Sequence, residues 1–153
     1  MPNPSHTDRS IEDSLYSVIE VLLDSQEGFQ KIGEEIKDPV VRAYLLDESL
    51  RRAEFRGELE TLLRDQGIHD IKEKGTAAGS VRRVWGELKA KMGGGDHTLL
   101  ATAEEGEDAA IQAYDEALAN TDLPLPVRQT LSTQNAHINA SHDYIKAARD
   151  NTK

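Results

Sequence analysis

The chain has 153 residues, no cysteine and a formal charge of -10 at pH 7. This length fits a single domain, since globular domains mostly have about 100–200 residues. Without cysteine there are no disulfides, thiolate metal sites or cysteine nucleophiles. No apolar run approaches the roughly 18 residues of a membrane span. The acidic pI near 4.9 argues against general nucleic-acid binding, which depends on neutralising phosphates.

The first 66 residues predict a helical hairpin. Residues 1–9 are polar and contain two prolines, so we expect a flexible arm rather than a signal peptide, and a cytoplasmic protein. Ser10 is a typical N-cap, and apolar residues then recur at spacings of three, four and seven as far as Ile36. Asp38-Pro39 starts a second helix that runs to about Gln66. The short link predicts two antiparallel helices.

The rest of the chain predicts a second hairpin after a long connection. A short helix is expected from Ala78 to Met92, with Trp85 packing as a core plug. Three glycines follow, and Asp96 is a suitable N-cap for a third long helix. A break at 120–126 precedes the fourth. No segment is typical of a strand.

These elements predict an all-α protein with residues 10–150 as one domain. The connection of roughly thirty residues is long enough to let the third helix run parallel to the second. Two antiparallel hairpins joined by such a crossover, here containing a short helix, are the topology of a ferritin-like four-helix bundle.

The net charge is unevenly distributed along the chain. Residues 10–66 carry fourteen acids and seven bases, whereas residues 96–119 carry seven acids and no base. Residues 69–92 between them carry three acids and six bases. We interpret the acidic third helix as a solvated face, and we expect the basic short helix to pair with the carboxylates of the bundle.

Helical periodicity places a few polar side chains on the buried faces. Glu48 lies at the centre of the second helix's apolar stripe, and Glu107 lies inside that of the third. His142 and Gln134 face inward from the fourth helix, with His137 at the margin. In the first helix every carboxylate is predicted to point away from the core.

Two interpretations of these residues remain open. Glu48, Glu107 and His142 could hold iron or manganese, because a buried carboxylate needs a metal or an ionic partner. The other interpretation is a structural polar layer in which Glu48 pairs with Arg52 or Arg51. It is favoured because di-iron bundles use Glu-x-x-His motifs, which this chain lacks.

Several segments resemble a known family. They are Gly75–Leu118, Asp122–Asp150 and two short pieces of the first hairpin, Glu27–Phe29 and Arg52–Phe55. Together they are similar to an uncharacterised family of bacterial ferritin-like four-helix proteins, a domain of unknown function, over residues 10–148. The resemblance implies a ferritin-like bundle, and more distant relatives imply a link to stress responses. It implies no catalytic residues, and His142 rather than His137 fits the family pattern.

The sequence therefore favours a non-enzymatic ferritin-like bundle that acts through its surface, as a homodimer or with another protein, in a stress-related role. The alternative is a metal-binding bundle with a reduced carboxylate and histidine ligand set. A third hypothesis is an adaptor that binds nucleic acid or protein through the basic short helix, where Arg82 and Arg83 flank Trp85.

Overall fold

The computed structural model describes residues 6–67, 85 and 93–152, and this part of the chain is all-α. Its four long helices are α1 (His6–Glu35), α2 (Pro39–Asp65), α5 (Asp96–Leu118) and α6 (Leu125–Asp150). The described residues contain no strand, as predicted. None of the described helices combines the length and apolarity needed to span a bilayer.

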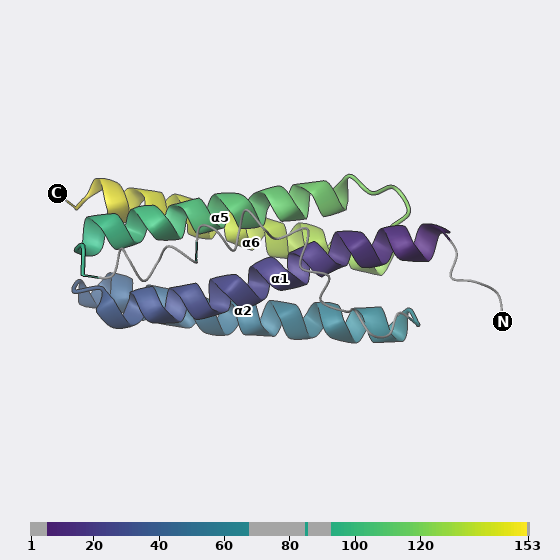
Figure 1. Ribbon diagram of the computed structural model, residues 1–153, viewed down its shortest axis with the longest axis horizontal. Coiled ribbons are helices and arrows are strands. Elements are labelled where there is room, and N and C mark those ends of the chain that lie inside the picture. Colours follow the sequence, from purple (N-terminus) through teal and green to yellow (C-terminus); the bar gives the residue numbers. More distant parts are fainter. Residues whose placement is uncertain (1–5, 68–84, 86–92, 153) are drawn as a thin grey trace.

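The helices pack as two antiparallel hairpins, which confirms the predicted pairing. α1 packs on α2 and α5 packs on α6, while α1 also contacts α5. α2 and α6 contact each other less extensively than these three pairs do. Figure 1 shows α2 and α5 running in the same direction, so the third long helix is parallel to the second, as predicted.

The predicted bounds of α2 are confirmed, whereas α6 begins at Leu125, inside the predicted break at 120–126, and the starts of α1 and α5 also differ. Asp38 caps α2 by accepting hydrogen bonds from the backbone of Val40 and Val41, and Gly67 follows the helix with φ of 77°. The helix α1, however, begins at His6, so Ser10 is not its N-cap and residues 6–9 are not an arm. Residues 1–5 lie outside the described residues. So does the predicted short helix, apart from Trp85, which is helical.

Asp96 has a different role from the one predicted. The N-cap of α5 is Gly95, with φ of 88°, and no side chain caps this helix end. The carboxylate of Asp96 instead accepts hydrogen bonds from the backbone N–H groups of Lys37 (2.9 Å) and Asp38 (3.1 Å). Asp96 therefore fastens the turn between α1 and α2 to the start of α5.

The Asp96→Ala variant should lose about 1–2 kcal/mol of unfolding free energy, because two backbone donors lose their acceptor. Urea denaturation at neutral pH measures this loss. Asp65→Ala, a change at an exposed position at the far end of α2, is the control and is expected to be nearly neutral. Equal midpoints for the two variants would mean that the Asp96 contacts contribute nothing.

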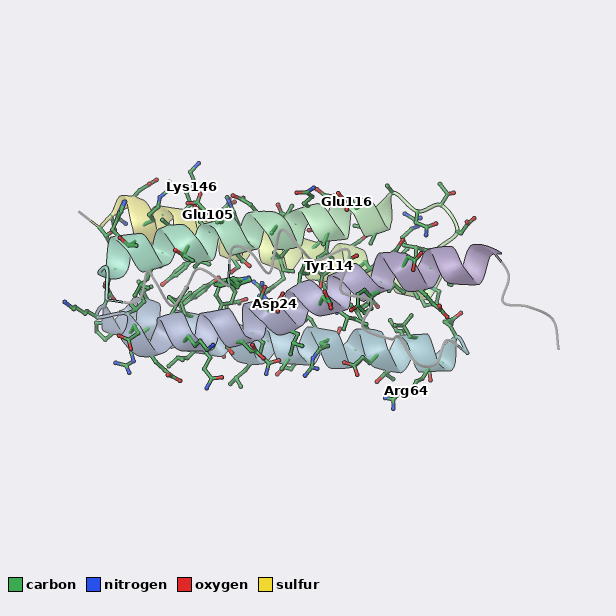
Figure 2. All side chains as sticks on the ribbon, viewed as in Figure 1. Asp24, Arg64, Glu105, Tyr114, Glu116 and Lys146 are labelled. Carbon is green, nitrogen blue, oxygen red and sulfur yellow. The ribbon has the colours of Figure 1, made fainter. Side chains whose placement is uncertain are left out.

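A polar layer divides the core into two apolar clusters. One cluster joins the first half of α1 to the second halves of α2 and α5, and includes Leu15, Leu59 and Tyr114. The other joins the opposite ends of the same helices and includes Phe29, Leu45 and Leu100. Figure 2 shows Tyr114 on the inner side of α5, while Glu105 and Glu116 lie on its outer side.

Between the clusters lie buried polar residues from all four helices: Ser25, Glu48, Ser49, Arg52, Glu107 and Ser141.

Trp85 packs against both apolar clusters, which agrees with the prediction that it acts as a core plug. Its ring meets Phe29 edge-on, with 5.6 Å between the ring centroids. A Cβ at Gly28 of α1 or at Gly106 of α5 would overlap the indole ring. Because Gly28 and Gly106 have no side chains, the indole ring of Trp85 fits between α1 and α5. We call these two glycines the seat of Trp85.

Candidate functional site

The centre of the bundle is occupied by the guanidinium group of Arg52. Arg52 lies at the midpoint of α2 and Glu107 lies at the midpoint of α5, and both side chains are fully buried. The Nη1 and Nη2 atoms of Arg52 donate to the two carboxylate oxygens of Glu107 at 2.6 and 2.8 Å. This is a bidentate ion pair, the strongest geometry that arginine and a carboxylate can form.

Arg52 also holds Glu48, one helical turn before it. Its Nη2 donates to Oε2 of Glu48 at 3.1 Å, so one guanidinium joins two buried carboxylates. The guanidinium carbon lies 4.9 Å from the ring centroid of Phe29, which adds a cation–π contact. The predicted pairing of Glu48 with Arg52 is thus confirmed. Arg51 instead pairs with Asp47 at the surface.

The electrostatics of this site keep Arg52 charged. Burial opposes the charged form of Arg52, but the attraction and hydrogen bonds of Glu107 and Glu48 outweigh it and raise the pKa of Arg52. Burial likewise raises the pKa of Tyr114 on α5, and that of Tyr44 on α2 to about 12. Both tyrosines are therefore neutral at physiological pH.

His137 is the fourth member of this group, although the sequence placed it at the margin. It lies at the midpoint of α6, and its Nε2 is 2.7 Å from Oε1 of Glu48. Its ring meets Phe55 edge-on at 5.3 Å, and its side chain is 33% exposed. Glu48 therefore lies between Arg52 and His137. We call Glu48, Arg52, Glu107 and His137 the central cluster.

Gln134 is a further buried polar residue of α6, and it contacts the part of α2 that follows Arg52. Its Oε1 accepts a hydrogen bond from the hydroxyl of Tyr114 at 2.7 Å. Its Nε2 donates to the carbonyl oxygen of Phe55 and to Glu58, both at 3.2 Å. The prediction that Gln134 faces inward is confirmed, and the residue ties α6 to both α5 and α2.

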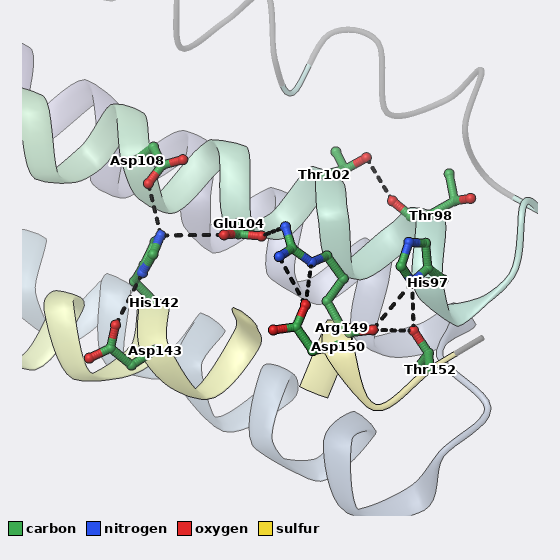
Figure 3. A network of polar contacts seen from close by, with 10 residues as sticks. All are labelled: His97, Thr98, Thr102, Glu104, Asp108, His142, Asp143, Arg149, Asp150 and Thr152. Carbon is green, nitrogen blue, oxygen red and sulfur yellow. Dashed lines mark hydrogen bonds and ion pairs between the residues drawn. The ribbon is translucent and has the colours of Figure 1, made fainter. Parts of the chain in front are cut away.

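His142 does not reach the central cluster. Its Nε2 is 2.8 Å from Asp108 and 3.7 Å from Glu104, both on α5, and its Nδ1 is 3.3 Å from the neighbouring Asp143. Figure 3 shows these contacts continuing from Glu104 to Arg149. His142 thus belongs to an ionic network at the outer seam of α5 and α6, rather than to the bundle's interior.

The first helix provides one further correction. Every carboxylate of α1 was predicted to face away from the core, but Glu20 is buried. Tyr16, one turn earlier, donates a hydrogen bond to it at 2.5 Å. The apolar stripe alone therefore did not reveal this side chain.

The structure does not bring the three residues predicted as metal ligands together at one point. The guanidinium of Arg52 lies between Glu48 and Glu107, and His142 contacts other carboxylates. The described residues include no group of three or more histidine, aspartate or glutamate side chains that could hold a metal ion. The arrangement instead provides a fixed internal cation.

Comparison with protein families matches residues 10–120 to a domain of unknown function, DUF2383. The chain belongs to this family. The DUF2383 match spans most of α1 with all of α2 and α5, so it includes Glu48, Arg52 and Glu107. His137 and His142, on α6, lie beyond it. A comparison with curated proteins found no match.

Proposed function

We propose that the chain is a ferritin-like bundle that does not use a metal centre and is not an enzyme. It acts by presenting its surface to a second copy or to another protein, in the stress-related role that the family resemblance implies. The observation that supports the proposal is the bidentate pair between Arg52 and Glu107 at the middle of the bundle.

Arg52 makes the central carboxylates poor metal ligands. A metal ion that bound Glu107 would have to displace two short hydrogen bonds, and it would leave a buried guanidinium without its main partner. The displaced charge would cost several kcal/mol unless the side chain reached solvent. The Arg52 side chain has no exposed surface, so it has no such exit in the folded bundle.

The outer face of α5 is the part of the surface most suited to a partner. Four carboxylates on it are exposed, those of Glu105, Asp108, Asp115 and Glu116, and residues 96–119 contain no lysine or arginine. Such a face raises the local concentration of a positively charged partner surface. This part of the proposal predicts that association weakens as salt increases.

Metal analysis of untagged protein tests the proposal. After incubation with Fe²⁺, Mn²⁺ or Zn²⁺ and dialysis, we expect well under one metal ion per chain, because Arg52 already holds the carboxylates. The measurement is elemental analysis by mass spectrometry.

Glu48→Gln is the matched variant, since it removes a carboxylate charge at nearly constant volume. The proposal expects the same low metal content in both proteins. A full equivalent of metal in the wild type that is lost in Glu48→Gln would contradict it.

A further inference from the structure

The central cluster lacks one positive charge if its histidine is neutral. Glu48 and Glu107 carry two negative charges, and Arg52 supplies one positive charge. All three side chains are at least 97% buried, so water cannot screen the excess. An unbalanced charge in such a site is costly, and it is normally removed by a partner or by a proton.

We propose that His137 is the second cation of the central cluster. In the folded protein its imidazole carries two protons, and its Nε2–H donates to Oε1 of Glu48. The cluster then holds two carboxylates and two cations. Docking of α6 against α2 is therefore coupled to the binding of one proton.

The contacts on each side of Glu48 support this assignment. Its Oε2 accepts from Arg52 at 3.1 Å and its Oε1 lies 2.7 Å from His137, a distance typical of a charge-assisted hydrogen bond. A protonated Glu48 would be the other way to balance the charge. It would put a proton on a carboxyl group that already accepts a hydrogen bond from the guanidinium of Arg52.

In the described part of the chain, neighbouring charged groups on α2 and α5 already have partners. On α2, Glu58 is held by Gln134, and Arg51 pairs with Asp47. On α5, Glu107 belongs to the cluster, while Glu104 and Asp108 pair with Arg149 or His142.

The buried tyrosines add no charge near the cluster. Tyr44 and Tyr114 are neutral because burial raises the pKa of each phenol. His137 is therefore the described side chain placed to complete the balance.

The proposal determines the sign of a pH effect. An ordinary histidine titrates near 6.5, so in the unfolded chain His137 is mostly neutral above about pH 7.5. If the folded chain keeps the proton there, the folded state binds more protons than the unfolded state. Stability then falls as pH rises, by a slope equivalent to about one proton per chain.

Nitrogen NMR of the histidine side chains in the full-length wild-type protein tests the proposal. At pH 7 we expect both ring nitrogens of His137 to have the shifts of an imidazolium, with an Nε2 proton that exchanges slowly. A neutral ring protonated at one nitrogen would overturn the proposal. So would a carboxyl carbon shift showing that Glu48 is protonated.

A glutamine variant provides a second readout. His137→Gln keeps a neutral hydrogen-bond donor but cannot bind the proton. Between pH 7 and 9, the stability of the wild type should fall with pH more steeply than that of His137→Gln, by a slope equivalent to about one proton. Equal slopes for wild type and His137→Gln would contradict the coupling.

Discussion

Replacing Arg52 with alanine is expected to lower the free energy of unfolding by about 3–5 kcal/mol. The change removes the cation that joins Glu48 and Glu107 and leaves two buried carboxylates without it. It also empties the volume of a large side chain at the bundle's midpoint. Urea denaturation followed by circular dichroism measures the loss.

Arg51→Ala is the control for this prediction. Arg51 is the next residue of α2, but its side chain is half-exposed and pairs with Asp47 at 3.7 Å. Surface pairs of this kind contribute about 0–1 kcal/mol. If Arg52→Ala cost less than about 1 kcal/mol, as we expect of Arg51→Ala, the central ion pair would not stabilise the fold.

Replacing Gly106 with alanine is expected to displace Trp85 from its seat. The added methyl group would overlap the indole ring, so either the ring or α5 must move. Overpacking of this kind costs about 1–3 kcal/mol. Because Trp85 is the single tryptophan of the chain, its fluorescence reports the displacement directly. We expect a red-shifted emission as the indole gains contact with water.

Gly57→Ala is the matched control, because Gly57 also lies inside a helix but a Cβ there would meet nothing within 4 Å. Its emission should match that of the wild type. Its stability should rise by up to about 1 kcal/mol, since alanine favours helix over glycine. An unchanged emission maximum in both variants would show that Gly106 does not form part of the seat of Trp85.

Local signals in the sequence were sufficient to predict the four long helices and their pairing into two hairpins. Asp38-Pro39 and Gly67 mark the bounds of α2 through a side-chain cap and a positive φ, both of which depend on neighbouring residues only. Asp96 was misassigned because its acceptor role involves Lys37 and Asp38, 59 and 58 residues away. A cap-like residue does not reveal whether its partner is local or distant.

The central cluster was predictable only in part. Glu48 and Arg52 lie one turn apart on the same helix, so their pairing follows from spacing. The pairs of Glu107 with Arg52 and of His137 with Glu48 join different helices, and they depend on the height and rotation of each helix in the bundle. Arg52, Glu107 and His137 each lie at the midpoint of their helix, so comparing helix centres would have indicated His137 rather than His142.

A crystal structure of the wild-type protein, grown with excess Mn²⁺ and measured for anomalous scattering, tests the central claim most directly. We predict continuous density for the Arg52 guanidinium between Glu48 and Glu107, and no anomalous peak in the bundle's interior. An anomalous peak bound by Glu48 and Glu107, with Arg52 turned away from them, would contradict the account.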